Sequence, residues 1–173
     1  MKINLYGGPG IGKSTVASLV FAELKVLGFN AELVHEYAKE LVYEGIDLRT
    51  VDSFFQDRIL IEQLRRELLF FNKVDFLITD SPLLLNAYYN GGKNAFAMVK
   101  STTGKSDLNF YLTRTNEHFE GKGRSHDELE SVAIDKKMLD FLKKQKVKII
   151  SVDGDSKAKA LKIVDIILGV KNA

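Results

Sequence analysis

The sequence predicts an α/β protein built on a doubly wound parallel sheet of five strands. Three observations lead to this prediction. Strand-like and helix-like segments alternate along the 173 residues, a glycine-rich loop joins the first strand to the first helix, and no repeat, low-complexity segment or interdomain linker interrupts the pattern. Such alternation requires helices that cross between parallel strands and cover both faces of the sheet.

Short apolar runs predict the strands, and apolar residues at helical spacing predict the helices. The expected strands are residues 2–6, 31–34, 74–79, 108–112 and 147–152. The expected helices are residues 14–27, 36–44, 50–71, 127–144 and 156–168, with a further helix starting near Pro82. Gly28 and Gly45 are typical stop signals for the first two helices. Residues 90–106 and 113–126 have no regular pattern.

The most informative segment is Gly7–Thr15, whose sequence GGPGIGKST fits the pattern G-x-x-x-x-G-K-[ST]. Its glycines let backbone N–H groups surround a phosphate, while the Lys13 ammonium reaches the β- and γ-phosphates and the Ser14 hydroxyl binds Mg²⁺. The first helix directs its positive end toward the same anion. The residues of this loop expected to bind ATP are Gly8, Pro9, Gly10, Ile11, Gly12, Lys13, Ser14 and Thr15. The sequence therefore predicts a site for ATP and Mg²⁺.

Composition limits the class of protein. The 25 basic and 23 acidic residues give a formal charge of +2, so no strong field for a polyanion is expected. The absence of cysteine excludes disulfides, thiol catalysis and thiolate metal sites, and it suits a reducing compartment. No segment resembles a signal peptide or reaches transmembrane length. We expect one domain over residues 1–173, located in the cytoplasm and without membrane partners.

Asp80 follows the third predicted strand, at the edge where parallel sheets open onto a ligand crevice. A carboxylate in this place can bind Mg²⁺ directly or through water. Alternatively, Asp80 caps the helix that starts near Pro82. The two roles are compatible if Ser81 is the cap, and we expect Asp80 to serve the metal and the phosphates.

Glu36 follows the second predicted strand and faces the same crevice. Its carboxylate can accept a proton from a hydroxyl that attacks the γ-phosphate. Alternatively, a glutamate at the start of a helix is favoured by the helix dipole alone. We expect Glu36 to act on the acceptor, with Tyr37 beside it in the acceptor site. His35 is expected to be structural or merely nearby.

The helix predicted over residues 50–71 has an apolar stripe that we expect to face inward. The stripe runs through Phe54, Ile61, Leu64, Leu68 and Phe71. Arg58 falls on the same side of the helix, and an arginine at a core-facing position needs a buried or ligand-borne anion. Arg58 is therefore a candidate for acceptor binding, or for pairing with Glu36 or Asp80. Gln63 is a candidate for recognition of a base or sugar.

The polar segment after the fourth predicted strand is expected to form a lid over residues 114–127. Small phosphotransferases need a mobile lid that closes over the triphosphate and excludes water. Arg124 is the expected cation for the transferring phosphoryl group, with Lys122 and Arg114 as second choices, and Arg114 is also expected to bind ATP. The alternative is a solvent loop with incidental basic residues. Gly154, after the last strand, is expected beside the nucleotide base, although a plain turn explains it equally well.

Four motifs together resemble a known group of small P-loop proteins. They are GGPGIGKST (7–15), EYAKELV (36–42), ITDSP (78–82) and GRSH (123–126). Proteins of this group are often encoded by tailed phages, are usually labelled AAA-like ATPases, and are related to the ribosylnicotinamide kinase domain of a bifunctional bacterial regulator of NAD biosynthesis. The same broad group includes thymidylate kinases, deoxynucleoside kinases and phage 5-hydroxymethyluracil DNA kinases.

The resemblance implies a P-loop fold of the nucleoside and nucleotide kinase type, with strand order 2-3-1-4-5 and a lid. It assigns Lys13 and Ser14 to the phosphates and Mg²⁺, Glu36 to the acceptor hydroxyl, Asp80 to the acid of strand three, and Arg124 to the lid arginine. The sequence also departs from the classical nucleoside kinases, because Ser81-Pro82 stands where they have an arginine. Arg58 is then the expected replacement for that cation. The arginine-finger partner domain and the sensor region of a true AAA motor are missing.

The expected function is transfer of the γ-phosphate of ATP to a hydroxyl of a nucleoside, nucleotide or modified base. One alternative is a 5-hydroxymethyluracil DNA kinase, whose DNA-binding surface would be formed by Lys93, Lys100, Lys105, Lys122 and Arg124. Another is an ATPase or switch that acts with a protein or DNA partner. A homodimer is compatible with the sequence, and the location is the host cytoplasm if a phage encodes the protein.

Overall fold

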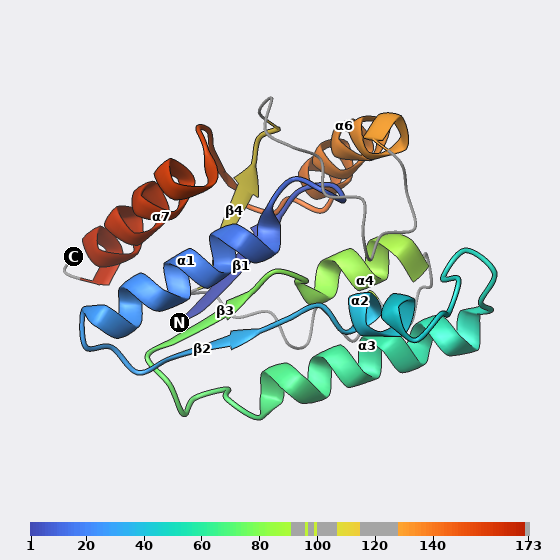
Figure 1. Cartoon of the computed structure of the whole chain (residues 1–173), viewed down its shortest axis with the longest axis horizontal. Helices are drawn as coiled ribbons and strands as arrows, with labels where there is room; N and C mark the ends of the chain where they lie inside the picture. The colour runs from blue at the N-terminus through green and yellow to red at the C-terminus, as the bar shows by residue number, and fades with distance from the viewer. Residues whose placement is uncertain (91–95, 97–98, 100–106, 115–127, 172–173) are drawn as a thin grey trace.

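The computed structural model describes residues 1–90, 96, 99, 107–114 and 128–171 (Figure 1). Its five-stranded sheet has the order β2-β3-β1-β4-β5, and every neighbouring pair is parallel. The strands are β1 (Lys2–Tyr6), β2 (Ala31–Val34), β3 (Phe76–Thr79), β4 (Leu108–Leu112) and β5 (Ile150–Val152). The predicted fold class and strand order are therefore confirmed.

Helices connect the strands as right-handed crossovers of parallel sheets require. They are α1 (Lys13–Val26), α2 (Tyr37–Tyr43), α3 (Ser53–Leu68), α4 (Leu83–Asn90), α6 (Glu128–Lys144) and α7 (Ser156–Lys171). Among the described helices, none is long and apolar enough to cross a membrane.

Where the boundaries differ from the prediction, they differ by at most three residues, as at the start of the fifth strand. We predicted that this strand starts at Val147, but β5 begins at Ile150. Residues before it complete the end of α6 instead, because Lys146 has a φ of 56° and the Val147 N–H donates to the Leu142 carbonyl at 3.1 Å. This hydrogen bonding is typical of a helix C-terminus. Val147, which the apolar pattern assigned to the strand, therefore completes the end of α6.

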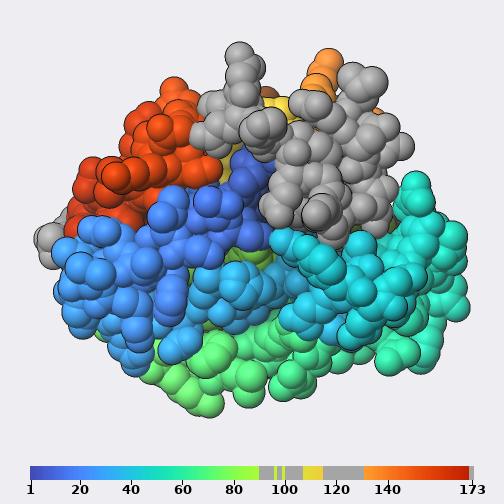
Figure 2. Space-filling view, viewed as in Figure 1, coloured from blue at the N-terminus to red at the C-terminus, as the bar shows by residue number. Residues whose placement is uncertain are grey.

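Side chains alternate along the strands, so each strand contributes to two cores. Leu5 and Phe110 pack with buried residues of α1 and α7 on one face of the sheet. Tyr6 and Tyr111, one residue further along, pack with buried residues of α4 and α6 on the other face. Figure 1 shows α1 and α7 together in front of the sheet, and Figure 2 shows them side by side on the molecular surface.

The inward stripe predicted for α3 is wrong. Phe54, Ile61, Leu68 and Phe71 are 50–72% exposed, and only Leu64 of the stripe packs against a core cluster. The buried residues of the helix are Ile59, Leu60, Gln63 and Glu67. Two of these are polar, and they are buried because they are paired internally, as in the 3.1 Å ion pair between Glu67 and Lys2. Apolar spacing alone therefore indicated the wrong side of the helix.

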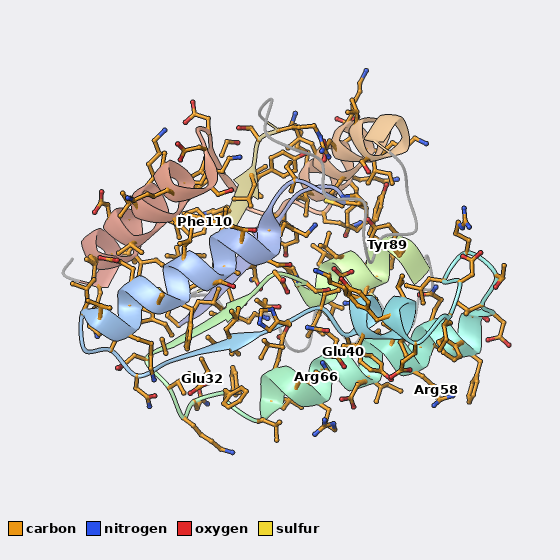
Figure 3. The ribbon with its side chains drawn as sticks, viewed as in Figure 1. Glu32, Glu40, Arg58, Arg66, Tyr89 and Phe110 are labelled. Carbon is orange, nitrogen blue, oxygen red and sulfur yellow. The ribbon has the colours of Figure 1, made fainter. Side chains whose placement is uncertain are left out.

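The same error misplaced Arg58. Its side chain is exposed on the outer side of α3, away from α2 and α4, where the guanidinium lies 5.4 Å from the Phe55 ring centroid (Figure 3). An arginine in water needs no buried anion. The structural reason for assigning Arg58 to the acceptor site is thus removed.

Candidate functional site

The P-loop connects the end of β1 to the start of α1. Gly7, Gly10 and Gly12 have φ values of 147°, 71° and 88°, a region that residues with a side chain rarely adopt. Lys13 is buried, and its ammonium donates to the carbonyls of Gly7 at 2.9 Å and Gly8 at 3.0 Å. The backbone of the loop thus holds the Lys13 ammonium inside its own curve, beside the positive end of α1.

Asp80 follows β3 and is only 2% exposed. Its Oδ2 lies 3.6 Å from His35 Nδ1, and its Oδ1 has no hydrogen-bond partner. Burial alone would raise the pKa of this carboxyl, but hydrogen bonding to His35 and Ser14, and the charge of Lys13, lower it below the ordinary value. The structure therefore presents an ionised carboxylate next to the Ser14 hydroxyl and the Lys13 ammonium.

These groups fit Mg²⁺. Mg²⁺ prefers oxygen ligands and is usually held by one or two protein groups together with phosphates and water. The Ser14 hydroxyl and the Asp80 Oδ1, which is buried and has no hydrogen-bond partner, offer such oxygens. The described residues contain no cluster of three His, Asp or Glu side chains that would hold a metal ion without other ligands. This arrangement suits a metal that arrives with a nucleotide.

His35 contacts a predicted site residue, Asp80, although the sequence indicated only a structural role for it. Its interaction with the Asp80 carboxylate raises the pKa of the imidazole above the ordinary value. The imidazole side chain remains 57% exposed. The only signal in the sequence was its place directly after β2, which brings it to the edge of the sheet where Asp80 follows β3.

A cavity of about 460 Å³ extends from the P-loop along the carboxyl edge of the sheet. It brings together Lys13, Asp80 and Glu36, which lie far apart in the sequence. The other residues that line it are Pro9, Ala38, Lys39, Val42, Leu48, Arg49, Val51, Asp52, Ser53, Gln56, Ile59, Ser81, Leu85, Asn86 and Tyr89. Its volume suits a small organic molecule.

Glu36 precedes the first residue of α2, and its side chain makes no capping hydrogen bond. The carboxylate is partly buried and lines the cavity. Both expected roles, action on the acceptor and a favourable interaction with the dipole of α2, are compatible with this position. The P-loop and Glu36 border one cavity, as expected for the donor and acceptor ends of a transfer site.

Gln63 has a different position from the one we predicted. It is 1% exposed, its Oε1 accepts from the Tyr37 N–H at 3.0 Å, and its Nε2 donates to the His35 carbonyl at 3.3 Å. The Gln63 amide thus forms hydrogen bonds with the backbone on both sides of Glu36. We assign Gln63 to holding this loop rather than to recognition of a base or sugar.

Arg66, one turn further along α3, also connects this helix to α2. Its guanidinium lies 4.6 Å from the Tyr37 ring centroid and donates to both carboxylate oxygens of Glu40 at 2.7 Å. Figure 3 shows Arg66 and Glu40 pointing toward each other between α3 and α2. Tyr37 does not line the cavity, so its observed role is in this α2–α3 contact.

The remaining predicted residues are partly described. Arg124 and Lys122 lie outside the described residues, as does the lid beyond Arg114. The Arg114 guanidinium contacts Asp135 and the Pro9 carbonyl. Gly154 has a φ of 108°, and a Cβ added at Gly12 would lie 3.4 Å from the Ser156 hydroxyl. The start of α7 therefore borders the P-loop, and the expected place of Gly154 beside the nucleotide base stays a prediction.

We expect Gln63→Met to weaken turnover without weakening ATP binding. The change removes two part-buried hydrogen bonds, to the Tyr37 N–H and the His35 carbonyl, which should lower the free energy of unfolding by about 1–3 kcal/mol. A displaced Glu36 should reduce the kcat/KM for the acceptor about tenfold or more. Steady-state kinetics and ATP titrations measure the two effects. Arg65→Met, an exposed change on the same helix, should alter neither.

The profile of a family described as an AAA domain matches residues 2–159. The chain belongs to this AAA domain family. A P-loop in such a domain implies nucleotide binding. No curated protein matches the chain.

Two solved structures have the same fold as this AAA domain. One is NadR in complex with NR, with a TM-score of 0.78 and 15% sequence identity, covering 99% of this chain. The chain spans 52%, about half, of that NadR chain. The other is deoxyadenosine kinase from M. mycoides with the products dCMP and dCDP, with a TM-score of 0.58 and 17% identity, covering 98% of this chain and 100% of that one. At these identities the likeness concerns the fold.

Proposed function

We propose that this AAA domain is an ATP- and Mg²⁺-dependent kinase that phosphorylates a hydroxyl of a nucleoside or nucleotide. The observation that carries the proposal is the single cavity bordered by Lys13, Asp80 and Glu36. The phosphate-binding loop opens onto it at one end, and the Glu36 carboxylate lines it beside α2.

The chemistry follows from the placement of three groups. Lys13 stabilises the negative charge of the β- and γ-phosphates during transfer. Ser14 and Asp80 would hold Mg²⁺, which supplies further charge neutralisation when bound with ATP. Glu36 accepts the proton of the acceptor hydroxyl as its oxygen forms a bond to the γ-phosphorus and the bond from that phosphorus to the bridging oxygen of ADP breaks. Arg124 is proposed as the lid cation, as the sequence suggested.

The lining of the cavity supports an acceptor of the nucleoside class. Apolar side chains of Val42, Leu48 and Val51 can cover the face of a base, while Asn86 and Tyr89 offer hydrogen bonds. The deoxyadenosine kinase with this fold contains dCMP and dCDP, which agrees with an acceptor of this kind. The five basic residues expected to form a DNA-binding surface, Lys93, Lys100, Lys105, Lys122 and Arg124, all lie outside the described residues.

Filling the cavity tests the location of the acceptor. We expect Val42→Trp to abolish the thermal stabilisation that nucleosides or nucleotides produce in the presence of a non-hydrolysable ATP analogue, because the indole occupies their space. Binding of the ATP analogue itself should be unchanged. Val26→Trp is the matched control, since Val26 is 82% exposed on α1. Unchanged acceptor binding by Val42→Trp would place the acceptor elsewhere.

Asp80→Asn should raise the Mg²⁺ concentration needed for half-maximal activity by about tenfold or more. The amide keeps the size of the side chain but removes the negative charge that attracts the cation. Titration of Mg²⁺ at saturating ATP measures the shift. Asp165→Asn, on α7 and exposed, is the control, and an identical Mg²⁺ dependence of the Asp80 variant and the wild type would exclude the metal role.

A further inference from the structure

An ion pair between Arg114 and Asp135, a residue that the sequence did not single out, holds the outer part of the P-loop. Asp135 lies on α6, and its Oδ1 accepts a hydrogen bond from the Gly8 N–H at 2.7 Å. Its Oδ2 accepts from Arg114 Nε, also at 2.7 Å. The same guanidinium donates through Nη2 to the Pro9 carbonyl at 3.0 Å. Asp135 and Arg114 therefore contact consecutive residues of the loop, Gly8 and Pro9.

The loop and α6 approach each other closely at this point. A Cβ added at Gly8 would lie 2.2 Å from Asp135 Oδ1 and 3.0 Å from the Ser131 carbonyl. The pattern G-x-x-x-x-G-K-[ST] leaves position 8 free to vary, so the glycine here is explained by α6 and not by the phosphate. The Tyr111 hydroxyl donates to the Asp135 carbonyl at 2.9 Å and fixes this turn of the helix.

The charge of Asp135 is unfavourable by itself. A carboxylate next to the P-loop repels the phosphates of a nucleotide, and the repulsion is strong where water is largely excluded. The side chains of Asp135 and Arg114 are only 16% and 21% exposed. Arg114 cancels this charge at 2.7 Å, so loop geometry and local neutrality both depend on the pair.

We propose that Asp135 is a positioning residue of the nucleotide site, and that Arg114 serves nucleotide binding by neutralising Asp135 and holding Pro9 rather than by direct contact with ATP. This inference depends on the ATP-binding part of the proposed function and not on the identity of the acceptor.

The test is a double-mutant comparison of the equilibrium Kd for a fluorescent ATP analogue with Mg²⁺. Arg114→Met leaves an uncompensated carboxylate beside the loop and should weaken binding about tenfold or more. Asp135→Asn should weaken it only a few-fold, because the amide oxygen still accepts from the Gly8 N–H. The double variant should bind more tightly than Arg114→Met alone, recovering most of the loss.

A direct contact between Arg114 and ATP predicts a different result. The double variant would then bind no better than Arg114→Met, and that outcome would overturn the inference. Arg114→Gln, alone and with Asp135→Asn, repeats the comparison with a side chain that can still donate to Pro9, in case the Met variant is unstable. Arg65→Met controls for loss of a paired surface arginine. Because only ATP binding is measured, failure of the rescue leaves phosphate transfer to an acceptor as a separate question.

Discussion

Replacing Lys13 by Ala should reduce phosphate transfer by at least about 10²–10³-fold. The ammonium is buried, lies within the curve of the P-loop and lines the cavity. Transfer of the label from γ-labelled ATP to an acceptor, measured at saturating ATP, gives the size of the loss.

The Lys13 variant needs a control for folding and for loss of charge. Lys25→Ala removes an exposed ammonium from the same helix and should keep full activity. Thermal unfolding of both variants should show that α1 is intact. Transfer at the wild-type rate by a folded Lys13→Ala protein would show that the P-loop is not the donor site.

Glu36→Gln should retain ATP binding and lose about 10²–10⁴-fold in turnover. The amide has nearly the same size and keeps an oxygen in the cavity, but it cannot take the proton from the acceptor hydroxyl. Comparison of the Kd for ATP with the kcat for transfer separates the two effects. Glu44→Gln, at the exposed end of the same helix, should behave as the wild type.

Normal transfer by Glu36→Gln at neutral pH would show that the carboxylate only contacts the acceptor, or plays no part.

The strand segments and the position of the P-loop were predictable because they depend on local patterns, whereas the order of the strands was implied by the resemblance to P-loop kinases. Strand-forming runs, a glycine-rich loop and helical spacing are all read within short windows. The ends of parallel strands also meet at one edge, which places Glu36 and Asp80 near Lys13 without knowledge of side-chain contacts. The observed cavity lining agrees with that reasoning.

The inner face of α3 was not predictable in the same way. Burial of Gln63 and Glu67 depends on partners far away in the sequence, the backbone beside Glu36 and the ammonium of Lys2. A polar residue with such partners is stable in the interior, but spacing along one helix does not reveal them. The exposed apolar stripe through Phe54, Ile61 and Leu68 therefore gave a stronger signal than the true inner face.

Asp135 was missed for a related reason. It lies among charged residues of α6, and neither motif nor spacing distinguishes it from a solvated side chain. Its importance follows from Gly8, which leaves space for the carboxylate to reach the loop. A glycine at a position that the P-loop pattern leaves free was the one available signal.

The central claim is that this AAA domain transfers phosphate to an organic hydroxyl. The most direct measurement follows label from γ-labelled ATP with nucleosides, nucleotides, ribosylnicotinamide, or DNA with and without 5-hydroxymethyluracil. We predict that one nucleoside or nucleotide takes up most of the released label, in a stoichiometric product with ADP. Transfer to modified DNA alone would show that the acceptor is a base within DNA and not a free nucleoside or nucleotide. Release of inorganic phosphate alone, stimulated by a protein or DNA, would contradict the kinase assignment.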